Sequence, residues 1–205
     1  MGPRERRERE REEIRGRILD AARELFATEG FEAVTMRRIA DRIEYSPTAI
    51  YFHFKDKEAL LKELCAIDFH ALAQQFGTIG RIDDPIERLR RSGHAYIRFG
   101  IEHPNHYRLM FMTPHPPIDD PEVDKGNPEE NAYAFVRSII VDALAKNLLR
   151  PELTDVDLIT QTVWAAVHGV VSLDVAKCND PWVDWRPMKK RAEASVEVVI
   201  NGIVR

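Results

Sequence analysis

Residues 35–61 read TMRRIADRIEYSPTAIYFHFKDKEALL, and this stretch decides the fold of the N-terminal part of the chain. Thr35 can cap the start of a helix, and Ile39, Ala40 and Ile43 recur at the spacing that gives a helix one apolar face. That face needs a core to pack against. The pattern therefore predicts a short helix that begins after Thr35 and buries its isoleucines.

A second short helix is expected directly after the first. Ser46 is a good N-cap residue, and Pro47 suits the first helical position because it has no N–H to leave unpaired. Thr48 and Ala49 are small side chains at the outer N-terminal positions, where they can approach base edges and thymine methyl groups. Two short helices joined by a tight turn are typical of a helix-turn-helix, whose second helix lies in the DNA major groove.

Groups at the far end of the second helix can complete the DNA contact. Tyr51, His53 and Lys57 can reach phosphates and fix the register on the duplex. An ordinary corner between two core helices is the alternative, but such a corner does not need Tyr-x-His-Phe-x-x-Lys in that order. The candidate DNA-contacting residues are Thr35, Arg37, Tyr45, Ser46, Pro47, Thr48, Ala49, Tyr51, His53 and Lys57.

Upstream of this stretch, apolar residues recur from Ile14 to Phe26 with helical periodicity, and Gly30 is placed to end that helix. Residues 4–13 alternate in charge sign. This pattern favours a solvated or disordered helical extension. The alternative is an arm whose arginines reach the DNA backbone.

Downstream, no segment shows the period-2 alternation of a strand, so the fold class is all-α. We expect an N-terminal three-helix helix-turn-helix domain over residues 1–60 and a larger helical ligand-binding and dimerisation domain over residues 61–205. A proline-rich loop is expected at residues 113–128. The further helices are expected at residues 56–76, 85–100, 104–112, 129–149 and 155–177, with a last one after Pro187.

Composition limits the class of protein. Hydrophobic residues make up 44% of the 205 residues, which is enough for a core, and two cysteines cannot build a disulfide framework. The chain opens on charged residues rather than on a signal peptide. The longest uncharged run, between Asp157 and Asp174, falls short of the roughly 20 apolar residues of a membrane span and favours a core helix. The expected location is the cytoplasm, without membrane association.

The charge balance argues against a generally basic DNA-binding domain. Residues 1–65 hold 14 basic and 14 acidic side chains, within a chain whose formal net charge is -4. DNA binding must therefore depend on where a few charges lie rather than on a global positive field.

The run from Thr35 to Leu61, preceded by a helix that ends in Glu29-Gly30-Phe31, resembles the DNA-binding signature of TetR-family transcriptional regulators. The resemblance implies an all-helical homodimer. It also implies that Tyr51 and Lys57 contact phosphates, that Thr48 and Ala49 face bases, and that Thr35 touches the DNA backbone at a helix N-terminus.

The chain departs from the family at the turn, where Glu44 stands at a position that is often glycine. A non-glycine residue at positive φ costs about 1 kcal/mol. We therefore expect the turn to adopt a different geometry and the acidic side chain to point away from DNA.

The C-terminal half resembles the family more loosely. Its Trp164-Ala165-Ala166-Val167-His168-Gly169 run has the Trp-x-x-x-His-Gly pattern of one TetR C-terminal subgroup, and the run from His103 to Phe111 is similar to that subgroup too. Trp164 and His168 share one helix face, and Gly169 would allow close helix approach. The alternative is a set of core aromatic residues with a satisfied histidine. The candidate effector-binding residues are Tyr96, Phe99, His103, Tyr107, Met110, Phe111, Trp164 and His168.

Two stripes of small and β-branched residues lie on the last two helices. Family resemblance places a dimeric four-helix interface there. Intramolecular packing is the alternative. The candidate interface residues are Val163, Val167, Val170, Val171, Val196, Val199, Ile200 and Ile203.

Neither metal binding nor catalysis has a motif in its favour. Five histidines fall in the C-terminal half, but no two are four apart, and no nucleophile elbow or phosphate loop is present. We expect no metal, no cofactor and no enzymatic activity. A helical enzyme or metal-binding protein is the rival interpretation.

The sequence therefore predicts a sequence-specific DNA-binding transcriptional regulator. Its expected partners are double-stranded operator DNA, a small-molecule effector and a second copy of the chain. A repressor released from a palindromic operator by the effector is favoured, and an activator with the same DNA site is the alternative.

Overall fold

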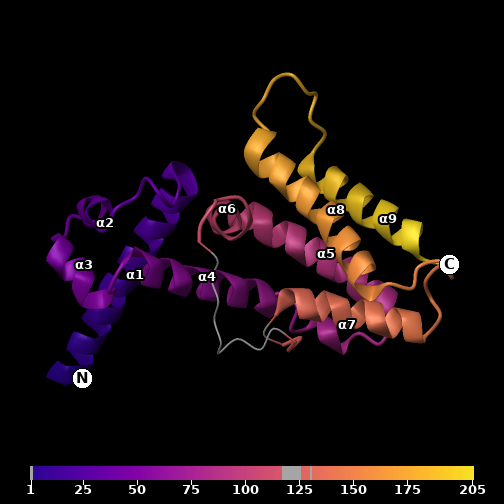
Figure 1. The fold of residues 1–205 in the computed structure, drawn as a ribbon, viewed down its shortest axis with the longest axis horizontal. Helices are drawn as coiled ribbons and strands as arrows, with labels where there is room; N and C mark the ends of the chain where they lie inside the picture. Colours follow the sequence, from indigo (N-terminus) through magenta and orange to yellow (C-terminus); the bar gives the residue numbers. More distant parts are fainter. Residues whose placement is uncertain (1, 117–125, 130) are drawn as a thin grey trace. The chain divides into compact units, whose positions relative to one another are not determined.

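A computed structural model describes residues 2–116, 126–129 and 131–205 (Figure 1). Its described residues form α-helices, one short 3₁₀ helix and a single isolated β-bridge between Leu149 and Val204, so the predicted all-α class is confirmed. Most of the expected loop at 113–128, residues 117–125, lies outside the described residues. The elements are α1 (Pro3–Glu29), α2 (Met36–Arg42), α3 (Pro47–His53), α4 (Lys57–Gln74), η1 (Ile79–Arg81), α5 (Pro85–Glu102), α6 (Pro104–Phe111), α7 (Ala132–Ala145), α8 (Val156–Lys177) and α9 (Met188–Ile203).

The chain divides into two compact units. The first runs to Asp68, within α4, and is joined by the segment that begins at Asn105, which carries α6. The second contains residues 69–104 and the described residues from 126 to the C-terminus. The predicted domain boundary after residue 60 placed α6 in the second domain, whereas in the structure α6 belongs to the first unit.

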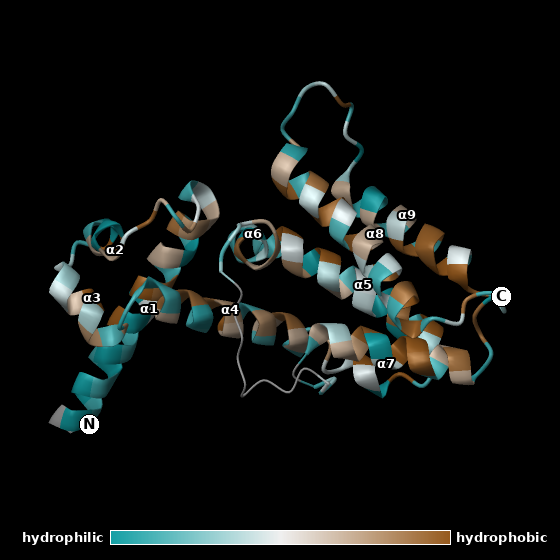
Figure 2. Ribbon diagram, in the orientation of Figure 1, coloured by the Kyte–Doolittle hydropathy of each residue, from teal (hydrophilic) through white to brown (hydrophobic). Residues whose placement is uncertain are grey.

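The first unit is built on an apolar core shared by α1 to α4 and α6. Ile18, Phe26, Ile39 and Ile50 have no exposed surface, and Leu109 of α6 belongs to the same cluster. The isoleucines of the quoted stretch are therefore buried as its periodicity predicts. Figure 2 shows that the N-terminal turns of α1 are hydrophilic, in contrast to the later turns that pack on this core.

The second unit packs α5 against α7, α8 and α9. Gly93 of α5 is the point of closest approach, since a Cβ there would lie 3.1 Å from Val196 Cγ2 and 3.6 Å from Val167 Cγ1. A Cβ on Gly169 would meet nothing within 4 Å in this chain. Close helix approach within the unit is thus provided by Gly93, and not by Gly169.

The stripe predicted as a dimer interface is largely a core within one chain. Because α8 and α9 turn this stripe toward α5, its buried members cannot face a second copy, which corrects the expectation for six residues. Val170 and Val199 are half-buried. The six buried members are Val163, Val167, Val171, Val196, Ile200 and Ile203.

Helix α8 is, among the described residues, the one helix long and apolar enough to cross a membrane, with a mean hydropathy of 1.3. Length and composition alone are weak grounds for a span, because a core helix passes the same test. Its buried face packs on α5, α7 and α9.

Candidate DNA-binding surface and effector site

Local capping fixes both helices of the helix-turn-helix. The Thr35 hydroxyl accepts a hydrogen bond from the Arg38 N–H at 3.1 Å, and the Ser46 hydroxyl accepts one from the Ala49 N–H at 3.2 Å. Pro47 occupies the first helical position of α3. These caps satisfy N–H groups that would otherwise lack partners, and they define where α2 and α3 begin.

The turn between the helices keeps the left-handed geometry that glycine favours. Glu44 has φ 62°, so the expectation that the turn would adopt a different geometry is wrong. Hydrogen bonds on both sides hold it: the Tyr45 N–H donates to the Ala40 carbonyl at 3.0 Å, and Arg17 donates to the Ile43 carbonyl at 3.1 Å. The surrounding contacts therefore offset the local strain at this residue.

Side chains at the start and on the outer face of α3 are open to solvent. Thr48 is exposed, Ala49 is half-buried, and Tyr51 and Phe52 are 55% and 74% exposed. Helix α3 therefore presents the small side chains of Thr48 and Ala49 at its N-terminal end and the phenol of Tyr51 further along. This arrangement fits a recognition helix that reads base edges and contacts phosphates.

The three arginines of α2 differ in their availability. Arg38 pairs with Glu29 at 3.0 Å, and Arg42 pairs with Glu24 at 3.0 Å, so both are used to attach α2 to α1. Arg37 is exposed and makes no ion pair within the part of the chain that the structure describes. Of these arginines, Arg37 is therefore the one with its charge available to a phosphate.

Two other candidate DNA-contacting residues have structural partners. The Lys57 ammonium donates to the Phe31 carbonyl at 2.8 Å and lies 4.1 Å from the centre of the Phe31 ring. Tyr45 lies under the Arg17 guanidinium, 5.2 Å from its ring centre, and packs on the core. Both residues brace the helix-turn-helix, and Lys57 keeps two of its three N–H donors for other acceptors.

His53 lies in surroundings that disfavour a positive charge on its ring. Its Nδ1 atom is buried without a hydrogen-bond partner among the described residues. Burial lowers the pKa of His53, and the nearby charges of Arg11 and Arg15 lower it further. A neutral ring is therefore favoured at neutral pH, and contact between His53 and a phosphate stays a prediction.

The sequence did not predict a buried ionic cluster in the first unit. Asp68 has no exposed surface, and its carboxylate accepts hydrogen bonds from Arg23 at 2.9 and 3.2 Å. The His106 Nδ1 atom lies 2.9 Å from the same carboxylate. The sequence did carry a signal for this cluster, which was Asp68 itself. Asp68 lies four residues from both Leu64 and Leu72, so it shares a helix face with two buried leucines. The cluster joins α1, α4 and α6.

In the second unit, three predicted effector residues meet. The Trp164 Nε1–H donates to the Tyr96 hydroxyl at 3.0 Å, and that hydroxyl lies 3.3 Å from His168 Nδ1. The Tyr96 hydroxyl accepts the indole N–H, and the direction of its hydrogen bond with His168 Nδ1 depends on which ring nitrogen carries the proton. Burial lowers the pKa of His168, so a neutral ring is favoured at neutral pH.

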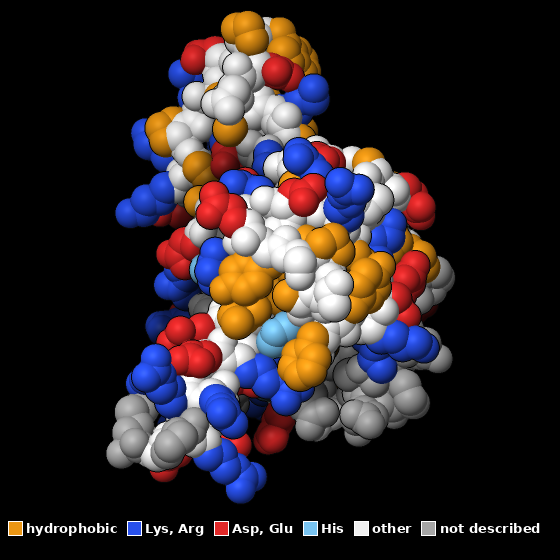
Figure 3. All heavy atoms as spheres, turned by 90° about the vertical axis from the view of Figure 1, so that its left-hand side faces the viewer, with side chains coloured by type: hydrophobic (Ala, Val, Ile, Leu, Met, Phe, Trp, Pro, Cys, Tyr) orange, Lys and Arg blue, Asp and Glu red, His pale blue; other side chains and the backbone are white. Residues whose placement is uncertain are grey.

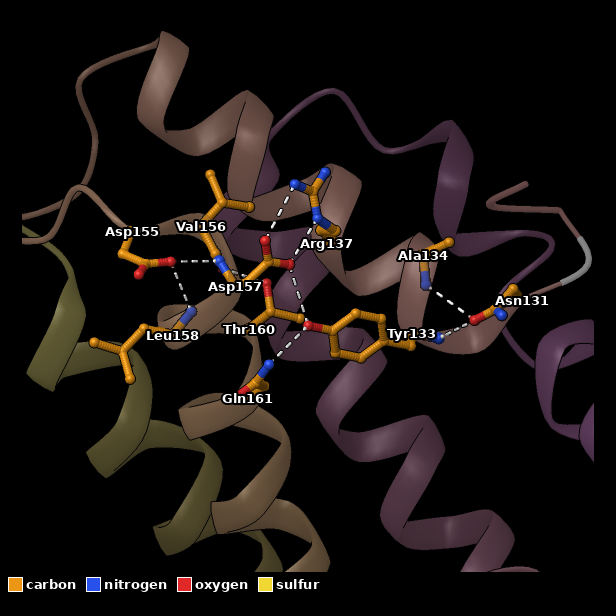
Figure 4. A network of polar contacts seen from close by, with 10 residues as sticks. All are labelled: Asn131, Tyr133, Ala134, Arg137, Asp155, Val156, Asp157, Leu158, Thr160 and Gln161. Atoms are coloured by element: carbon orange, nitrogen blue, oxygen red, sulfur yellow. Dashed lines mark hydrogen bonds and ion pairs between the residues drawn. The ribbon is translucent and has the colours of Figure 1, made fainter. Parts of the chain in front are cut away.

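Tyr133 extends this cluster to the start of α8 and was missed by the sequence analysis. Its ring meets that of Trp164 edge to face at a centroid distance of 6.3 Å. Figure 4 shows its hydroxyl between the Asp157 carboxylate at 3.3 Å and the Gln161 amide at 3.5 Å. Arg137 neutralises Asp157 at 2.8 Å.

The remaining predicted effector residues are divided between the two units. The rings of Phe99 and His103 meet at a tilt, with centres 5.2 Å apart, in the second unit. The rings of Tyr107 and Phe111 are also tilted, with centres 5.0 Å apart, on α6 in the first unit. Tyr107 has no exposed surface, and Met110 is buried with it on α6. The structure therefore brings together Tyr96, Trp164 and His168, but it groups the α6 residues with the DNA-binding unit.

The described residues offer neither a cluster of metal ligands nor a reactive thiol at Cys65. No three His, Cys, Asp or Glu side chains among them lie close enough together to hold a metal ion. Burial and the nearby Asp68 raise the pKa of Cys65 to about 12, so its thiol stays protonated.

A capped pair of short helices that presents small side chains on the second, carried by an all-helical chain, defines a helix-turn-helix regulator of transcription. Residues 18–64 match the family described as bacterial regulatory proteins, tetR family, and residues 89–199 match the one described as tetracyclin repressor-like, C-terminal domain. The chain belongs to the TetR family.

Individual relatives agree with this assignment. The transcriptional repressor KstR2 of Mycolicibacterium smegmatis is 31% identical over 165 residues, which is 75% of this chain and 78% of the relative. The transcriptional regulator UidR of Escherichia coli is 37% identical over 78 residues, and the match spans only 37% of UidR and 38% of this chain. The structure of the TetR-family regulator PfmR of Thermus thermophilus superposes with a TM-score of 0.72 at 25% identity, covering 93% of this chain and 97% of PfmR.

Proposed function

We propose that this chain is a ligand-responsive repressor that binds a palindromic operator as a homodimer and is released by a small-molecule effector. The observation that carries the proposal is α3, a capped recognition helix with Thr48 exposed at its N-terminal end and Tyr51 exposed on its outer face. The helix is held by its neighbours rather than by DNA, so it is preorganised for binding.

Each protomer would insert α3 into a major groove. Thr48 and Ala49 would meet base edges, while Tyr51 and Arg37 would contact phosphates on either side. A dimer places two such helices about 34–36 Å apart, one helical turn of DNA. Basic and acidic side chains are interspersed over the face seen in Figure 3, so affinity would depend on these few contacts, doubled by dimerisation.

The effector site would form around Tyr96, Trp164 and His168, with Tyr133 beside them. The indole and phenol rings supply apolar surface, and the hydroxyl and imidazole supply directed hydrogen bonds, which is the usual make-up of a small-molecule site. The nearby charges of Asp157 and Arg137 neutralise one another, and His168 favours its neutral form. An uncharged organic ligand with a hydroxyl or carbonyl group suits this chemistry. Trp164 and His168 also carry the Trp-x-x-x-His-Gly pattern, which supports assignment to that C-terminal subgroup.

The dimer surface would use the outward faces of α8 and α9 rather than their buried stripe. Leu158, Leu173 and Val198 are 61%, 50% and 71% exposed, and Trp164 is 39% exposed. Exposed apolar side chains on two adjacent helices are candidates for contact with a second copy, and two such helices from each copy would form a four-helix interface. Val170 and Val199 lie at the margins of these faces as half-buried members of the predicted set.

Selection of bound sequences from a random DNA library by the full-length protein tests the DNA-binding part. We expect a palindromic consensus whose half-sites are about one helical turn apart. Footprints on that consensus should show Tyr51→Phe and Arg37→Ala weakened on all sequences, and Thr48→Ala altered in base preference. Arg42→Ala is the matched control, because this arginine is paired with Glu24 and should change affinity little.

Two outcomes would overturn the proposal. The first is the absence of any enriched sequence. The second is equal affinity for the Tyr51→Phe, Arg37→Ala and Arg42→Ala proteins. Transcription in vitro from a promoter that carries the consensus then distinguishes a repressor, which lowers transcript yield, from an activator, which raises it.

A further inference from the structure

The N-terminal turns of α1 form a helix with no folding role of their own. The helix begins at Pro3, but its first fully buried side chain is Ile18, and all side chains from Arg4 to Glu13 are exposed. Ion pairs between residues four apart hold these turns, among them Arg6 with Glu10 at 2.9 Å. A helical extension that buries nothing serves something outside the core.

The charges of these turns are sorted between two faces. At about 100° per residue, Arg4, Arg7 and Arg11 lie within a narrow arc, and the one acidic residue beside them is Glu8. The other face carries the remaining charges and is net acidic. Its residues are Glu5, Arg6, Arg9, Glu10, Glu12 and Glu13.

The arginine face adjoins the recognition helix. The Arg11 guanidinium lies 5.5 Å from the centre of the Phe52 ring, at the C-terminal end of α3. One turn further along α1, Arg15 donates to the carbonyl oxygen of His53 at 3.2 Å. Figure 1 shows the N-terminal turns of α1 projecting beyond α3. The row Arg11, Arg7, Arg4 therefore continues the surface of α3 outward.

Two members of the row have their charge available. Arg7 and Arg11 make no ion pair within residues 2–116 or the other described segments, while Arg4 is linked to Glu8 at 3.4 Å in an exposed pair. A helix rises 1.5 Å per residue, so the row spans about 10 Å. One DNA strand carries about three phosphates over that length of helix axis.

We propose that Arg4, Arg7 and Arg11 form a second DNA-binding element, which contacts backbone phosphates adjacent to those reached from α3. This inference rests on the proposed operator binding and extends it. The element carries no base readout, because a row of guanidinium groups on an exposed helix meets phosphates rather than base edges. It accounts for how residues 1–65, with 14 acidic and 14 basic side chains, present positive charge: apart from Glu8, the acidic groups of these turns lie on the face away from the row.

The salt dependence of binding tests the proposal, measured on the selected consensus duplex with full-length protein. Each phosphate contact contributes about 0.9 to the slope of log K against log salt. The double variant Arg7→Ala/Arg11→Ala should lower the magnitude of that slope by about 3.6 for a dimer. The matched control is Arg6→Ala/Arg9→Ala, which removes the same charge from the opposite face and should change the slope by less than about 1.

Two further measurements complete the test. Arg7→Lys/Arg11→Lys keeps the charge and should restore most of the slope, and circular dichroism should show all variants folded. The loss should be equal on the consensus and on a random duplex of the same length, since backbone contacts are not sequence-specific. Equal slopes for the two alanine double variants, with a consensus still bound, would overturn this inference alone. Failure of the wild-type protein to select any consensus would overturn the proposed function as well.

Discussion

Removing the Asp68 carboxylate tests the buried ionic cluster of the first unit. Asp68 has no exposed surface, Arg23 is 7% exposed, and their closest contact is 2.9 Å. In Asp68→Ala the Arg23 guanidinium stays buried, with only the exposed Asp20 left as a partner at 3.0 Å. His106 loses its carboxylate partner at the same time.

The expected cost follows from that uncompensated charge. Removing one partner of a buried ion pair costs about 3–5 kcal/mol. For a chain of this length each kcal/mol lowers the melting temperature by about 2–4 °C, so we expect a drop of about 6–20 °C. Replacing both partners with apolar side chains, in Arg23→Met/Asp68→Leu, should recover most of the loss, because no buried charge then remains.

Urea unfolding followed by circular dichroism, at one fixed protein concentration, measures these free energies. Arg42→Ala is the control, because its ion pair with Glu24 is exposed and should contribute less than about 1 kcal/mol. If Asp68→Ala costs no more than this control, or if the apolar double variant is as unstable as Asp68→Ala, the reasoning about the buried charge is refuted.

Three other changes have outcomes of defined sign. Glu44→Gly should stabilise the protein by about 1 kcal/mol because the residue sits at φ 62°. Asn147→Gly, at φ 54°, should stabilise it by less, since asparagine tolerates this region of φ. Thermal melts that rank the two variants in the reverse order would contradict this prediction. Burial lowers the pKa of His168 from 6.5, so the unfolded state binds a proton at this residue more tightly than the folded state does. As the pH falls through about 6.5, the free energy of unfolding of the wild type should therefore drop relative to that of His168→Gln. Parallel pH profiles for the two proteins would contradict this prediction. Val198→Glu should shift sedimentation toward the monomer without loss of helix content, whereas Lys189→Glu, about 180° away on α9, should leave the dimer intact. If both variants remain dimers, the outward face of α9 at Val198 is excluded as a dimer surface.

Features that depend on neighbours in the chain were predictable. The caps at Thr35 and Ser46, the end of α1 at Gly30 and the start of α8 after Asp155 all follow from side chains that satisfy N–H groups within three residues, or from a glycine that tolerates positive φ. The burial of Ile39 followed in the same way from helical periodicity. Such signals are local, so they survive without knowledge of the tertiary fold.

The direction that a helix faces was not predictable for α8 and α9. Both helices are apolar on more than one side, so periodicity alone could not tell the core stripe from the exposed one. Packing on α5 decided it: Val167 and Val196 turn inward beside Gly93, which leaves Leu173 and Val198 outside. Six of the eight predicted interface residues are therefore buried within one chain, and a dimer interface on α8 and α9 stays a prediction.

Contacts between distant residues were likewise inaccessible from the sequence. Nothing local shows that Asp68 meets Arg23 and His106, because these residues are brought together only when helices pack. Tyr96 and His168 were both candidates for one effector site, but the sequence did not show that they share a hydrogen bond. Such pairs depend on how the helices are placed relative to one another, and the spacing of residues along a single sequence does not reveal that placement.

The sequence by itself determined the helix-turn-helix and its candidate DNA contacts. The tertiary structure decided which basic groups are already committed to partners within the chain. Arg38 and Lys57 are held by α1 and by the Phe31 carbonyl, whereas Arg37, Arg7 and Arg11 retain charge for phosphates. The physical reason is that an ion pair is a contact through space, so the charge available to DNA is what remains after the helices have packed.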